Sequence, residues 1–142
     1  MDAIILAAAG VARLELSLPY AVVLDSGIFV PAAGQGALGV EYLACRQELK
    51  ALLQQLDHAS SRICVEAERA FVRELGAGCH APAGAIARLE NNALHLHGFV
   101  ASENGLPQLR RSKTGLAAEA LALGSSLARE IREEALALGL NC

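Results

Sequence analysis

The chain has 142 residues, of which 54% are hydrophobic and 19% charged, and its formal net charge is -3 at pH 7. This composition excludes a disordered chain, and the lack of a basic excess argues against a nucleic-acid binder. No apolar stretch is long enough to span a membrane, so we expect a cytoplasmic protein with reduced thiols and no membrane partner.

The first segment is an apolar run at residues 3–9 that continues toward Arg13. Its Ala-x-Ala pattern occurs in secretory signals, but the chain opens with an acidic residue instead of the basic region that such signals carry. Periodicity does not distinguish a buried strand from a helix here. We interpret the run as buried structure, and because it begins without a polar lead-in we expect it to belong to a larger protein.

Residues 34–39 match the pattern G-x-G-x-x-G, which dinucleotide-binding folds place between a strand and a helix. Here Pro31 precedes the pattern and the residues that follow it are typical of extended chain, so that context is missing. Glycine allows two backbones to approach closely, and we expect a hinge or a chain crossing at this point. A helix with leucines on one face is predicted after Cys45.

A second helix is predicted from Ser60 or Ser61, either of which can cap its N-terminus, to Gly76, which can end it in a left-handed conformation. Its apolar residues recur at a spacing of four and therefore share one face. These residues are Ile63, Ala67, Phe71 and Leu75.

Three strands are predicted next, at residues 84–90, 93–102 and 106–113, with turn signals at Asn91-Asn92 and Asn104-Gly105. Thr114 is the predicted cap of a final helix with an apolar stripe, and Gly139 is its predicted end. Helix, three antiparallel strands and helix together indicate a compact α+β unit.

The polar residues of this unit do not form a recognisable metal or protease motif. His95 and His97 share one strand face, as two metal ligands can, but no third ligand is visible and we interpret them as exposed strand histidines. Cys79 and His80 are adjacent in the sequence, whereas catalytic partners are adjacent in space. The basic run at residues 110–113 is interpreted as a solvated strand end.

Cys79 differs from the other three cysteines in its neighbours. Small residues flank it on both sides between Gly76 and Gly84, so that a bulky group attached to its thiol would not clash. The chain has no Cys-x-x-Cys pair for zinc or redox chemistry, and a domain of this size does not need a disulfide. On this basis alone, an attachment site and a loop cysteine without a function are equally well supported.

Three segments taken together resemble the signatures of the porphobilinogen deaminase (hydroxymethylbilane synthase) family, in the family's order. They are residues 2–14, residues 31–41 with a Gly-Gln-Gly core, and residues 67–84 around Cys79. The resemblance covers essentially the whole chain. It implies a dipyrromethane cofactor that is bound to Cys79 through a thioether and primes the condensation of four porphobilinogen molecules into hydroxymethylbilane, a step of tetrapyrrole and heme biosynthesis.

The residue type suits that bond. Loss of ammonia from porphobilinogen leaves an electrophilic methylene group, which a soft sulfur nucleophile captures as a stable thioether. A disulfide would be reducible and an oxygen ester would hydrolyse. The partial negative charge at a helix C-terminus raises the pKa of a nearby thiol, so activation of this thiol requires cations from elsewhere in the fold.

By resemblance, three further residues contact the cofactor. Arg13 matches an arginine that binds the acetate and propionate groups of cofactor or substrate, a task that suits a guanidinium. Gln35 and Gly36 match a loop that lines the active cleft. The chain departs from the family at Ala77, where glycine is usual, and after Glu41, where an arginine often found is absent.

The resemblance also implies a domain organisation. Residues 1–30 would be the tail of domain 2, residues 31–56 a hinge and return segment of domain 1, and residues 59–142 the cofactor-anchoring domain 3. The predicted fold class is therefore α+β, with a C-terminal three-stranded antiparallel sheet packed with helices, preceded by partial segments of α/β domains.

The family's catalytic aspartate belongs to a portion that the sequence does not contain. We therefore expect no catalytic residue and no metal site in this chain, and no turnover by the chain alone. The expected ligands are porphobilinogen and the growing pyrrole chain, and the expected protein partner is either the missing N-terminal half or a second copy. The alternative function is a non-catalytic domain that folds or pairs with another chain. A thiol-redox or metal protein is disfavoured.

Overall fold

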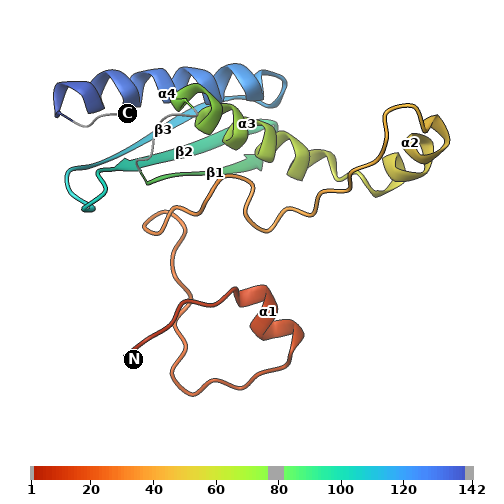
Figure 1. Ribbon diagram of the computed structural model, residues 1–142, viewed down its shortest axis with the longest axis horizontal. Helices are drawn as coiled ribbons and strands as arrows, with labels where there is room; N and C mark the ends of the chain where they lie inside the picture. Colours follow the sequence, from red (N-terminus) through yellow and green to blue (C-terminus); the bar gives the residue numbers. More distant parts are fainter. Residues whose placement is uncertain (1, 77–81, 140–142) are drawn as a thin grey trace.

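The computed structural model describes residues 2–76 and 82–139. Within them a sheet with two helices on one face forms the compact part of the molecule, and a long, mostly irregular N-terminal segment leads up to it (Figure 1). The compact part consists of α3 (Ala59–Leu75), β1 (Ala83–Glu90), β2 (Ala93–Ala101), β3 (Gln108–Leu116), the short 3-10 helix η2 (Ala117–Glu119) and α4 (Ala120–Ala137).

The three strands are antiparallel and lie in the order β1-β2-β3, so that β2 is central and β1 is an edge strand. The predicted α+β class, with a three-stranded antiparallel sheet packed with helices, is confirmed. The turn between β1 and β2 is the predicted one, and both of its residues, Asn91 and Asn92, have positive φ angles of 47° and 68°. Asparagine tolerates this conformation better than most residues.

The core lies between the sheet and the two helices. Alternate residues of β2 (Leu94, Leu96 and Val100) point toward the helices and are 0% exposed, as the period-2 pattern predicts. Gly98 belongs to the same row, and the ring of Phe71 from α3 occupies the space beside it: a Cβ on Gly98 would lie 2.6 Å from Phe71 Cε2. Phe71 itself is fully buried.

The two helices approach each other closely at Gly124 of α4. A Cβ at this position would lie 2.8 Å from Ala70 Cβ and 2.9 Å from Phe71 N, and nearer still to the carbonyl oxygen of Ala67. Helix axes this close require small residues at the contact, because any side chain would meet the backbone of the opposite helix. Further along the two helices, Glu74 of α3 pairs with Arg132 of α4 at 3.1 Å.

The opposite face of the sheet carries the two strand histidines. They are half-buried rather than exposed, because hydroxyl groups of β3 lie beside them. Nδ1 of His95 is 3.0 Å from Oγ1 of Thr114, and Nδ1 of His97 is 2.7 Å from Oγ of Ser112. Within residues 2–76 and 82–139, no group of three or more His, Cys, Asp or Glu side chains could hold a metal ion.

Two predicted helix caps are wrong. α3 begins at Ala59 with His58 at its N-cap, and the side chain of Ser61 lies against Nδ1 of His58 at 2.9 Å. Thr114 lies inside β3, because that strand begins only at Gln108 and runs on to Leu116 before α4 starts. Gly76 ends α3 as predicted and has a positive φ of +104°, but its ψ of 142° differs from that of the predicted left-handed cap.

The N-terminal segment contains α1 (Ala8–Arg13), α2 (Gln47–Leu53) and the short 3-10 helix η1 (Gln54–Leu56). The interpretation of residues 3–9 as buried is wrong for the described structure: Ile5 is 82% exposed, and α1 has no buried residue. The physical reason is that no layer of the compact part covers them, since every buried core residue lies at Ala67 or beyond. None of the described helices is long and apolar enough to cross a membrane.

Candidate functional site

The glycine-rich loop crosses the edge strand β1, as expected, although the glycine that permits the crossing lies on the strand. The carbonyl oxygen of Pro31 accepts a hydrogen bond from the backbone N–H of Ala85 at 3.0 Å. A Cβ on the neighbouring Gly84 would lie 2.6 Å from the same oxygen. The close approach therefore depends on Gly84, because any other residue would push the loop away.

A buried carboxylate holds the next part of the loop. Glu68 of α3 is 7% exposed, and its two oxygens accept hydrogen bonds from two different segments. Oε2 accepts from the N–H of Gly34 at 2.6 Å, and Oε1 accepts from the N–H of Ala87 at 2.8 Å. Glu68 thus joins the loop to the edge strand from a third element, the helix.

The loop itself is a tight turn. Gly34 and Gly36 have φ angles of +73° and +84°, which favour glycine. The N–H of Gln35 donates to the carbonyl of Ala32 at 3.0 Å, and Oε1 of Gln35 accepts from the N–H of Ala32 at 3.2 Å. The side chain of Gln35 therefore folds back over its own turn.

A pocket of about 420 Å³ lies between this turn and the first half of α3. The turn contributes Gln35, Gly36 and Ala37, and β1 contributes Ala87 and Leu89. The remaining lining residues are His58 at the N-cap of α3 and, on the side of that helix, Ser60, Ser61, Cys64, Val65 and Glu68. Among the described residues, the lining includes no lysine or arginine, and it includes the carboxylate of Glu68. A dipyrromethane carries several carboxylates of its own, which require cationic partners. The described lining of this pocket therefore does not supply the cationic partners of that cofactor, which would have to come from other parts of the protein.

Cys64 is the thiol of this pocket. Burial raises the pKa of the Cys64 thiol above its ordinary value, the negative charge of Glu68 acts in the same direction, and a backbone hydrogen bond from Leu89 offsets part of the rise. Because the thiolate is the reactive form, a raised pKa makes this cysteine a poor nucleophile near neutral pH.

Cys64 is accordingly expected to react with iodoacetamide several-fold more slowly than the exposed Cys45 near pH 8. The difference narrows as the pH rises toward the raised pKa of Cys64, where its thiolate fraction catches up. Peptide mass spectrometry of the partly alkylated chain measures the two rates, and the denatured chain is the control in which they converge. Equal rates in the folded chain would contradict the expectation.

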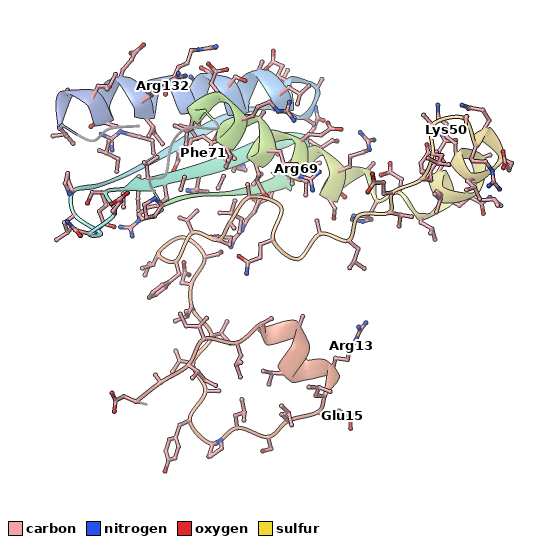
Figure 2. The ribbon with its side chains drawn as sticks, viewed as in Figure 1. Arg13, Glu15, Lys50, Arg69, Phe71 and Arg132 are labelled. Atoms are coloured by element: carbon pink, nitrogen blue, oxygen red, sulfur yellow. The ribbon has the colours of Figure 1, made fainter. Side chains whose placement is uncertain are left out.

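The remaining predicted site residues are not brought together with the pocket. Arg13 lies at the end of α1, well away from the sheet and from Arg69 of α3 (Figure 2). Cys79 lies outside the described residues. The residues around it that are described are Gly76, at the end of α3, and Pro82, before β1. Of the predicted cofactor contacts, the structure thus places only Gln35 and Gly36 together.

Sequence reasoning missed Glu68 and Gly84. Glu68 is in the same helical row as Cys64 and Phe71, and an acidic residue in an otherwise apolar row is a signal for a buried, bonded carboxylate. Gly84 carries no comparable signal, because a glycine at the start of a strand is common and the loop that needs it lies more than fifty residues away.

Comparison with known proteins places two family regions along the chain. A family model described as "Porphobilinogen deaminase, dipyromethane cofactor binding domain" matches residues 1–51, and one described as "Porphobilinogen deaminase, C-terminal domain" matches residues 62–133. The loop that carries Gln35 falls in the first region, and Glu68 falls in the second.

Similar curated proteins have the same description. The porphobilinogen deaminase of Chromobacterium violaceum is 47% identical over 130 residues, which are 92% of this chain and 42% of that protein. Those of Roseiflexus sp. and Natranaerobius thermophilus are each 40% identical, over 94% and 99% of this chain and 44% and 45% of their own lengths. The chain spans less than half the length of these relatives.

Proposed function

Because the chain belongs to the porphobilinogen deaminase family, we propose that it forms the cofactor-anchoring part of a hydroxymethylbilane synthase. The observation that carries the proposal is the succession of two family regions, at residues 1–51 and 62–133, the first of which is named for the dipyrromethane cofactor. The proposed reaction is the condensation of porphobilinogen into a linear tetrapyrrole, a transferase step of tetrapyrrole and heme biosynthesis.

Cys79 is the proposed anchor, through a thioether. Its position in the third signature and its small neighbours support this role, as does the stability of a carbon–sulfur bond toward reduction and hydrolysis. When bound, the cofactor supplies the terminal pyrrole onto which substrate units are added. A free thiol is needed for the attachment, which favours a reducing, cytoplasmic setting.

Arg13 and the loop of Gln35 and Gly36 are the proposed contacts to the pyrrole carboxylates. The guanidinium of Arg13 can bind a carboxylate through two parallel hydrogen bonds, and the amide of Gln35 can add one more. Arg13 is on α1, apart from the described pocket, so the proposal requires that the N-terminal segment and the Cys79 region face a common cleft in the assembled protein (Figure 2).

The proposed partner is a polypeptide that supplies the rest of the family's length. The exposed apolar side chains of the N-terminal segment support this, since Ile5, Val22 and Val23 are each more than 80% exposed. Patches of this kind mark surfaces that another protein segment covers. Self-association would cover the same surface, and size-exclusion chromatography of the purified chain separates the two cases.

The experiment that tests the function is intact-mass measurement of the chain, produced alone and together with the polypeptide that covers the remaining part of a relative. In the second case we expect the chain to gain the mass of one dipyrromethane unit, mapped by proteolysis to the peptide that contains Cys79. The assembly is expected to consume porphobilinogen and the chain alone is not. An unmodified Cys79 in the active assembly, or turnover by the isolated chain, would contradict the proposal.

A further inference from the structure

We infer that Glu68 is the positioning residue of the site: it fixes the turn that presents Gln35. The inference rests on the proposed function in that Gln35 is taken as a cleft residue. The contacts that carry it belong to the described structure, so it can be tested separately from the chemistry at Cys79.

The burial of Glu68 requires a structural role. It is the one charged side chain among the buried residues of the described chain, at 7% exposure. A carboxylate is costly to remove from water unless hydrogen bonds replace the lost solvation. Here the N–H groups of Gly34 and Ala87 do so, and bonds from amides to a charged acceptor are stronger than neutral ones.

The two hydrogen bonds to the carboxylate of Glu68 connect it to different parts of the chain. The bond from Ala87 ties Glu68 to the edge strand, which the sheet holds in place. The bond from Gly34 reaches across to the loop, 34 positions earlier in the sequence, and ends on the residue directly before Gln35. One oxygen is thus anchored, and the other sets where the turn begins.

A second contact also holds the loop against the edge strand. The carbonyl oxygen of Pro31 is bonded to the N–H of Ala85, so the loop is held at two points three residues apart. Directly after the second point, the side chain of Gln35 closes the turn by accepting a hydrogen bond from the N–H of Ala32. Without Glu68 the bond at Pro31 and the packing of Ala33 against the core remain, but the hydrogen bond that fixes Gly34 is lost.

The turn and Glu68 fall in different family regions, 1–51 and 62–133. Glu68 therefore couples the proposed cleft loop to the unit that follows it in the chain. Its action is indirect: it touches the backbone of the turn, and Gln35 makes the proposed contact with the ligand.

The test is amide hydrogen exchange by NMR on the full 142-residue chain, comparing Glu68→Gln with the parent. An amide in place of the carboxylate keeps one acceptor and turns an NH₂ group toward the other N–H. Exchange at Gly34 and Gln35 is expected to accelerate roughly tenfold or more, while the centre of β2 is unchanged.

Glu66→Gln is the matched control, because it makes the same charge change two residues away on a side chain that pairs with Arg62. It is expected to leave the exchange at Gly34 unchanged. Equal exchange at Gly34 in both variants would overturn the inference. Thermal denaturation of each variant shows whether it is folded. None of these readouts depends on a cofactor, so failure of the adduct at Cys79 and failure of this inference are distinguishable.

Discussion

Gly124→Ala is expected to destabilise the folded chain by about 3 kcal/mol or more. The added methyl group would lie 2.8 Å from Ala70 Cβ and 2.9 Å from Phe71 N, and nearer still to the carbonyl oxygen of Ala67. Because two of these atoms belong to the backbone of α3, no rotation of a side chain relieves the clash. The helices must separate, and the core between them and the sheet loses its packing.

For this substitution, the packing clash and helix propensity predict changes in stability of opposite sign. Alanine is a better helix former than glycine by about 1 kcal/mol, so helix propensity alone predicts that the same substitution stabilises α4. Urea denaturation followed by circular dichroism measures the difference. Gly10→Ala is the control: it makes the same change inside α1, where no atom lies within 4 Å of the new methyl group. A variant at Gly124 as stable as the parent would show that the helices do not approach as described.

Cys79→Ser is expected to abolish the dipyrromethane adduct in the assembled protein. The hydroxyl of serine is nearly isosteric with the thiol but a far weaker nucleophile at neutral pH, so no stable bond to the cofactor is expected. Intact-mass measurement should give the unmodified mass for this chain, and porphobilinogen turnover by the assembly should fall below detection.

Cys45→Ser provides the comparison, since Cys45 is exposed and lies outside the pocket. It is expected to keep the full adduct and the full turnover. An adduct of the same mass in Cys79→Ser, mapped to another cysteine, would show that the anchor has been assigned to the wrong residue. Cys64 is a poor substitute anchor, because burial and the charge of Glu68 raise the pKa of its thiol.

Most of the compact part could be predicted because its patterns are local. The spacing of four in α3 and the alternation in β2 place Phe71 and Leu96 in the core, and both are fully buried. The Asn91-Asn92 turn separates the first two strands, as its composition indicates. The errors lie at element ends. Thr114 is a good helix cap in isolation, but in the fold it alternates within β3 and its hydroxyl pairs with His95.

The candidate site was harder to predict because it depends on contacts between distant segments. The sequence points to Gln35 and Gly36 through a motif, yet nothing local shows that Gly34 is held by Glu68, or that Pro31 rests on Gly84. The prediction of burial for the apolar run at residues 3–9 fails for a related reason: hydrophobicity indicates that a segment is suited to burial, but not which surface covers it.

Backbone N–H groups on the outer side of β1 are already hydrogen-bonded within the chain, and this affects how readily the chain aggregates in concentrated solution. An edge strand normally offers its free N–H groups to strands of other molecules, which is a route to fibrils and precipitates. Here Ala85 donates to Pro31 and Ala87 donates to Glu68. A strand from another molecule would have to displace a carboxylate and leave it buried without that partner, which opposes the pairing. The contacts that shape the cleft loop thus also protect this edge of the sheet from aggregation.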